Sequence, residues 1–158
     1  MARRMSTSER KDHRKYAVDC FNGTWTLLTK KKRTKAEDLE MIHRAHASRY
    51  HWGLVGNAQT LAIGEWQISR VYAVLRRPEP ALFHAKECLR LCRENGIRDF
   101  PLAFAYEALA RASAVAGRKG DTRRFIDQAL RAGDTIREAD DRELFVRDIE
   151  TVPGFRAR

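Results

Sequence analysis

Residues 58–77 read AQTLAIGEWQISRVYAVLRR, and residues 99–118 read DFPLAFAYEALARASAVAGR. The second segment repeats the first at an offset of 41 positions, and the match continues into the residues that follow each segment. Eight positions are identical at this offset: Leu61 and Leu102, Ala62 and Ala103, Arg70 and Arg111, Ala73 and Ala114, Val74 and Val115, Arg77 and Arg118, Leu89 and Leu130, and Arg90 and Arg131. A fixed offset of this length is typical of arrays of helical hairpins. Residues 58–96 and 99–137 are therefore predicted to be two copies of one helix-turn-helix unit, and residues 7–53 a third, diverged copy.

The spacing of apolar residues favours helices along the whole chain. Leu102, Tyr106, Leu109 and Ala112 follow one another at intervals of three and four, which is the period of one helix face. No segment alternates apolar and polar residues as a half-buried strand would. The predicted fold class is all-α.

Helix boundaries are predicted from capping residues and glycines. Ser6 with Glu9 and Thr34 with Glu37 each form a capping box, in which the hydroxyl accepts a backbone N–H and the Glu reaches back to the cap residue. Further N-cap candidates are Asn57, Glu79, Asp99, Asp121 and Asp140. Seven helices are predicted, at about 7–29, 35–53, 58–76, 80–95, 100–117, 121–137 and 140–150.

Composition limits the class of protein. The chain is 43% hydrophobic and long enough for one domain with its own core, so residues 7–153 are expected to be a single domain between a disordered basic tail, 1–6, and a short tail, 154–158. Three cysteines do not suggest a disulfide scaffold, and no secretory leader or long apolar run is visible. We expect a cytoplasmic protein without membrane association.

The repeat resembles the tetratricopeptide (TPR) family. The TPR-like positions of the second unit are Tyr106, Leu109, Ala110, Gly117, Ile126, Ala129 and Leu130, and those of the first are Ile68, Ser69, Tyr72, Ala81, Ala85, Cys88 and Leu89. The repeat is longer than the usual 34 residues, and Arg76 stands where the turn glycine would be. The chain is also similar to small bacterial TPR-like proteins of unassigned function. The resemblance implies a right-handed stack of three helical hairpins, a TPR-like α-solenoid, with helix 140–150 as its cap.

The resemblance also implies a non-catalytic module that binds a protein or peptide, or associates with itself into a homo-oligomer. In TPR proteins the first helix of each hairpin lines a concave surface. Its outward positions here are Trp66, Arg70, Glu107 and Arg111, which we expect to bind an acidic peptide or a small anion. In the alternative interpretation, Glu107 neutralises an arginine in an internal ion pair and the N-terminal helix covers this face. No cofactor is expected.

Histidines suggest a second function class, a small enzyme or a pocket for a metal or small molecule. His43, His46 and His51 lie on or near the end of one predicted helix, and they are expected to meet Trp66, Tyr72 or Glu65 if they form a site.

A metal site is the alternative interpretation of the histidines and cysteines. His84, Cys88 and Cys92 step by four along a helix, so the alternative metal ligands are His43, His46, His84 and Cys88. The simpler interpretation is that the cysteines are core residues without a chemical role.

The distribution of charge suggests a third class, nucleic-acid binding. Residues 1–35 carry 11 Lys/Arg and three acidic residues, whereas residues 36–158 carry 20 and 18, so most of the net charge of +10 is N-terminal. Such a basic segment, which includes the run Lys30-Lys31-Lys32-Arg33, could contact phosphates electrostatically. The alternative is a solvated arm and loop, favoured because no aromatic residues alternate with the lysines.

Overall fold

The computed structural model describes residues 4–157, and the expected tails fall partly on residues 1–3 and 158, outside the described residues. It contains seven helices and, within residues 4–157, no strand. The helices are α1 (Thr7–Leu28), α2 (Lys35–Val55), α3 (Ala58–Val74), α4 (Pro78–Glu94), α5 (Asp99–Val115), α6 (Lys119–Gly133) and α7 (Ala139–Ile149). The prediction of an all-α fold is confirmed. None of these helices is both long and apolar enough to cross a membrane.

Side-chain caps set the starts of the first three helices. Ser6, Thr34 and Asn57 each accept the backbone N–H three residues ahead, as predicted. The later N-cap predictions are wrong: α4, α5, α6 and α7 start earlier than Glu79, Asp99, Asp121 and Asp140 would place them, and their cap residues form no side-chain cap hydrogen bond. Only short turns connect α3 to α4 and α5 to α6, so these turns, rather than a capping side chain, set the first residues of α4 and α6.

Two of those turns have the same backbone geometry at the 41-residue offset. Arg76 and Gly117 both adopt a positive φ, of 58° and 73°. The next residue donates its N–H back to the preceding helix in both turns, from Arg77 to the Tyr72 carbonyl and from Arg118 to the Ser113 carbonyl, each at 2.9 Å. This is the hydrogen bond of a Schellman motif. Arg76 therefore occupies the conformation that glycine has in the second unit.

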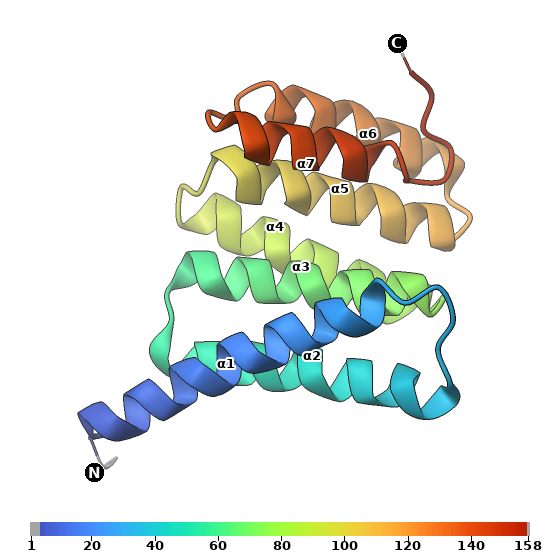
Figure 1. Ribbon diagram of the computed structural model, residues 1–158. Coiled ribbons are helices and arrows are strands. Elements are labelled where there is room, and N and C mark those ends of the chain that lie inside the picture. Colours follow the sequence, from blue (N-terminus) through green and yellow to red (C-terminus); the bar gives the residue numbers. More distant parts are fainter. Residues whose placement is uncertain (1–3, 158) are drawn as a thin grey trace.

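The helices pack most closely as three consecutive pairs, α1 with α2, α3 with α4, and α5 with α6, while α7 lies against α5 and α6 (Figure 1). Small side chains let the backbones approach within the two later pairs. The fully buried small residues there include Ala81, Ala85, Cys88, Ala103, Ala110, Ala112 and Ala129. The Ser69 hydroxyl also donates to the Ala81 carbonyl at 2.8 Å, which ties α3 to α4.

Helix α1 crosses its partner obliquely, so that its C-terminal half reaches α3 (Figure 1). The rings of Trp25 on α1 and Trp66 on α3 are 5.4 Å apart. Trp66 in turn contacts Phe104 of α5 edge to face at 5.0 Å, and Phe104 contacts Phe145 of α7 at 5.5 Å. This row of aromatic rings joins α1, α3, α5 and α7 through one core.

Candidate functional site

Trp66, Arg70, Glu107 and Arg111 come together around the Glu107 carboxylate. One carboxylate oxygen lies 3.2 Å from Nη2 of Arg70 and 2.6 Å from Nη2 of Arg111. The other oxygen accepts the indole N–H of Trp66 at 3.3 Å. The Arg70 guanidinium also lies over the Trp66 ring, 5.6 Å from its centre. The offset of 41 residues thus correctly predicted that these side chains are neighbours.

Asp148 of α7 completes this cluster, and sequence reasoning missed it. Nη2 of Arg70 is 2.5 Å from the Asp148 carboxylate. Nη2 of Arg111 donates to the Asp148 backbone carbonyl at 3.0 Å and to the Thr151 hydroxyl at 2.8 Å. Two guanidinium groups therefore face two carboxylates. No motif in the sequence pointed to Asp148, because it lies outside the two copies of the 41-residue repeat.

Burial and the neighbouring charges act in opposite directions on the pKa of Glu107. Removal from water raises the pKa of a carboxyl group, but the Arg70 and Arg111 guanidiniums, with the hydrogen bonds from Arg111 and Trp66, outweigh this and hold the pKa of Glu107 below its ordinary value. Glu107 is therefore an anion inside the protein, stabilised by its partners.

The cluster is an internal one, in contrast to the outward-facing positions expected. Glu107 is fully buried, Trp66 is 7% exposed, and the Arg70 and Arg111 side chains are 11% and 12% exposed. Trp25 of α1 contacts the Trp66 ring, and Asp148 of α7 contacts Arg70. This arrangement matches the alternative interpretation, an internal ion pair, and it leaves little of the two arginines for a ligand.

The histidines separate into two groups rather than converging. His46 Nε2 lies 3.0 Å from the Tyr72 hydroxyl, which is one of the predicted contacts. His51 instead contacts His13, with the two Nδ1 atoms 2.8 Å apart, and His43 is exposed. The three-histidine site is therefore not formed.

Near His46, a polar cluster joins α2, α3 and α4. The Glu65 carboxylate bridges Arg49 Nε at 2.8 Å and His84 Nδ1 at 2.6 Å. Burial would raise the pKa of Glu65, but the hydrogen bond and charge of His84, followed by those of Arg49, lower it. Burial lowers the pKa of His46, and the neighbouring His84 adds to this effect. The Glu65 carboxylate therefore has both of its oxygens bonded to side chains of the protein, and the two cavities described below are lined by other residues.

The alternative metal ligands are not assembled. In the part of the chain that the structure describes, no group of three or more His, Cys, Asp or Glu side chains is placed to bind a metal ion. Cys88 and Cys92 are buried within the main apolar core. A hydrogen bond with Cys92, together with burial, raises the pKa of Cys88, as expected of an unreactive thiol.

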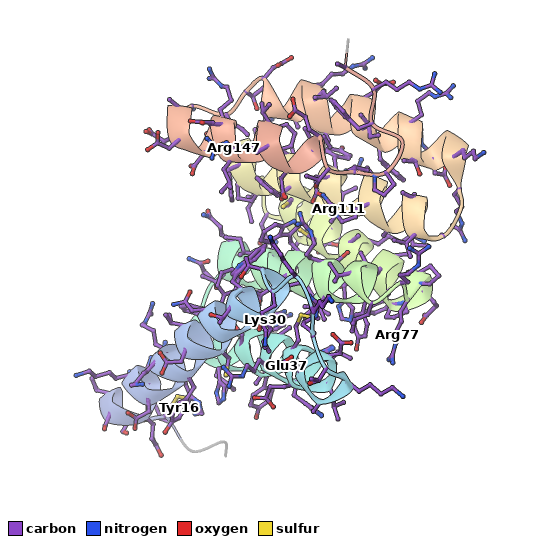
Figure 2. All side chains as sticks on the ribbon, turned by 45° about the vertical axis from the view of Figure 1, so that its right-hand side comes forward. Tyr16, Lys30, Glu37, Arg77, Arg111 and Arg147 are labelled. Atoms are coloured by element: carbon purple, nitrogen blue, oxygen red, sulfur yellow. The ribbon has the colours of Figure 1, made fainter. Side chains whose placement is uncertain are left out.

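The basic N-terminal region is partly neutralised. Lys30 pairs with Glu37 across the connection between α1 and α2 (Figure 2), and Arg33 pairs with Asp38 at 2.7 Å. Rings of α1 and α2 form one cluster, whose members are His13, Tyr16, Tyr50 and His51. That cluster lies far along α1 from the lysine run, which limits its use as a stacking surface for the same ligand.

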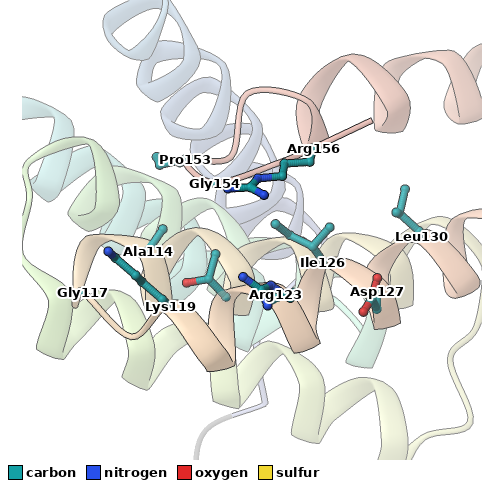
Figure 3. Close-up of a pocket in the computed structure, with 11 residues that line it drawn as sticks. Ala114, Gly117, Lys119, Arg123, Ile126, Asp127, Leu130, Pro153, Gly154 and Arg156 are labelled. Carbon is teal, nitrogen blue, oxygen red and sulfur yellow. The ribbon is translucent and has the colours of Figure 1, made fainter. Parts of the chain in front are cut away.

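The C-terminal end of the bundle carries an open groove of about 480 Å³ between α6 and the segment that follows α7 (Figure 3). Its apolar residues include Ala114, Ile126 and Leu130. Its basic side chains are Lys119, Arg123 and Arg156, and one carboxylate, Asp127, lies among the lining residues. This groove combines an apolar surface with an excess of basic over acidic side chains.

Sequence reasoning did not find the groove. Lys119 and Arg123 lie one helical turn apart on α6, but Arg156 comes from the segment after α7. Their proximity therefore depends on where α7 and this segment pack. Comparison with known proteins supplies no further guide: no family model, curated protein or solved structure matches this chain.

Proposed function

We propose that this chain is a TPR-like protein-binding module built as a right-handed stack of three helical hairpins with α7 as its cap. Three observations support this architecture: the pairing of consecutive helices, the 41-residue offset, and the equivalent turns at Arg76 and Gly117. Stacked hairpins of this kind present extended surfaces to partners. The internal pairing within the two polar clusters makes an enzyme the weaker hypothesis.

The ligand that we propose is an acidic segment of a partner protein, and the groove beside α6 is its site. The observation that carries this proposal is the combination of an apolar floor with Lys119, Arg123 and Arg156 around it. A partner helix or peptide that carries carboxylates beside an aliphatic residue matches both properties. The guanidiniums would bind the carboxylates, and Ile126 and Leu130 would contact the aliphatic side chain.

Fluorescence anisotropy with a synthetic helical peptide tests this proposal. The peptide carries Leu along one face and Glu on the others, and a matched peptide has Lys in place of Glu. We expect the Glu peptide alone to bind, and the double variant Lys119→Glu, Arg123→Glu to weaken it about tenfold or more, because two attractive charges become repulsive.

Arg131→Glu is the matched control, because Arg131 is exposed on the same helix but does not line the groove. If this control weakens the Glu peptide as much as the double variant, the attraction is general and the groove proposal fails. A single-stranded oligonucleotide that binds the chain in place of the peptide, with affinity that falls steeply with salt, would favour nucleic-acid binding instead.

A further inference from the structure

A second cavity, of about 600 Å³, lies at the opposite end of α6. It is formed where α4 ends, α5 begins and α6 ends, and the connections from α4 to α5 and from α6 to α7 lie at the same end of the bundle (Figure 1). The volume falls in the range of about 300–1,000 Å³ that is usual for small-molecule sites. This cavity is separate in lining from the groove proposed for the protein partner.

Positive charge dominates this second cavity. Three arginines line it, Arg93, Arg98 and Arg137, against one carboxylate, Asp99. Asp99 offsets one of these three charges: its Oδ1 accepts the Phe100 N–H at 2.7 Å, and its Oδ2 lies 4.0 Å from Arg137 Nε. Within residues 4–157, neither Arg93 nor Arg98 forms an ion pair.

The cavity is lined by both polar and apolar side chains. Nη2 of Arg93 donates to the Tyr106 hydroxyl at 3.1 Å, so the guanidinium is held at the cavity wall. Ile97 and Leu102 supply an apolar surface beside the arginines. An anionic group would bind the guanidiniums, and an organic group would cover the aliphatic side chains.

We propose that this cavity binds a small phosphorylated molecule, through a diphosphate group held by Arg93, Arg98 and Arg137. Guanidinium groups match phosphate oxygens in pairs of hydrogen bonds, and a diphosphate carries the negative charge that three arginines and one carboxylate leave unbalanced. This site shares no lining residue with the groove beside α6, so the diphosphate site and the peptide-binding groove are tested independently.

Isothermal titration calorimetry of the full chain with inorganic pyrophosphate, at constant ionic strength, tests the proposal. We expect saturable binding, and we expect Arg98→Gln and Arg137→Gln each to weaken it about tenfold, since each removes one guanidinium. Adenosine diphosphate is expected to bind more tightly than pyrophosphate, because its organic part contacts the apolar surface, whereas adenosine alone should bind far more weakly. Circular dichroism verifies that the variants are folded.

Arg90→Gln is the control for general charge, because Arg90 lies on α4 near the cavity but is paired with Glu87 and Glu94. It should leave the affinity for pyrophosphate unchanged. The proposal is overturned if no saturable binding occurs, if Arg90→Gln weakens binding as much as Arg98→Gln, or if substitutions at Lys119 and Arg123 abolish it. Tighter binding of the tricarboxylate citrate would overturn the assignment of a phosphate ligand.

Discussion

The Arg70 guanidinium of α3 lies 2.5 Å from the Asp148 carboxylate of α7, although 78 residues separate them in the chain. The same nitrogen, Nη2, is 3.2 Å from the buried Glu107 of α5. One arginine therefore joins the third, fifth and seventh helices. Burial opposes the charged form of Arg70, but Glu107 and Asp148 outweigh it and raise the pKa of Arg70, so the ion pairs are intact at neutral pH.

The first prediction is that Glu107→Gln destabilises the fold by about 3–5 kcal/mol, because it leaves two largely buried arginines with one carboxylate between them. Denaturation by urea, followed by circular dichroism, measures this change. Glu143→Gln is the control, because Glu143 pairs with Arg147 on the exposed face of α7. That change should have little effect. Equal effects of the two substitutions would show that the buried cluster adds no stability.

The second prediction concerns the acid sensitivity that Glu107 confers. Its pKa is lower in the folded protein than in the unfolded chain, so its contribution to stability is complete above the ordinary carboxyl pKa. The contribution is lost as the pH falls through the lower pKa of the folded state. The difference in unfolding free energy between the protein and Glu107→Gln should therefore shrink in strong acid. A difference that stays constant with pH would contradict the assignment of an ionised Glu107.

Sequence reasoning succeeded where the determinants are local or repeated. The capping boxes at Ser6 and Thr34 involve groups within four residues, and the offset of 41 brought Arg70 and Arg111 together. Sequence reasoning failed where tertiary packing determines which side chains are buried or in contact. Asp148 lies outside the repeat, so no offset points to it. The burial of Trp66 depends on the angle at which α1 crosses, which no local pattern encodes.

The end of α6 illustrates the same limit. The helix was expected to continue to 137 but ends at Gly133, after which Ile136 is fully buried in the core. Apolar periodicity cannot distinguish one more helical turn from an inward-facing residue in the following loop. The two cavities lie at opposite ends of this helix, and each includes residues from distant segments. Motifs in the sequence therefore predicted neither cavity.

The third prediction uses the two equivalent turns. Arg76→Gly should stabilise the protein by about 1 kcal/mol, because a side chain at positive φ is strained. Gly117→Ala should destabilise it by about the same amount, for the same reason. Gly120→Ala is the control, since Gly120 lies in α6 with open space around it and without a positive φ. Thermal unfolding of the three variants measures these effects, and a loss of stability in Arg76→Gly would refute the equivalence of the turns.

The fourth prediction concerns the docking of α7. A Cβ atom at Gly133 would overlap the Phe145 ring, which is buried against α6. Gly133→Ala should therefore destabilise the protein by about 1–3 kcal/mol through overpacking. The double variant with Phe145→Leu should lose less stability than the sum of the two single variants, because the smaller side chain leaves room for the methyl group. Additive losses would show that the two residues do not press on each other.

The fifth prediction is that His46 makes the fold sensitive to mildly acidic pH. Burial lowers the pKa of His46, the charges of His84 and His43 act in the same direction, and Glu65 opposes them. The unfolded chain therefore binds a proton at His46 more readily than the folded protein does. Its contribution to stability is complete above the ordinary histidine pKa, about 6.5, and is lost as the pH falls through the lower pKa of the folded state.

His46→Gln removes this titration while keeping a side chain that can hydrogen-bond to the Tyr72 hydroxyl. We expect the unfolding free energy of the variant to fall less than that of the unchanged protein between neutral and mildly acidic pH. Direct measurement of the His46 pKa by NMR titration completes the test, since a value at or above that of a free histidine would mean that burial does not govern this side chain.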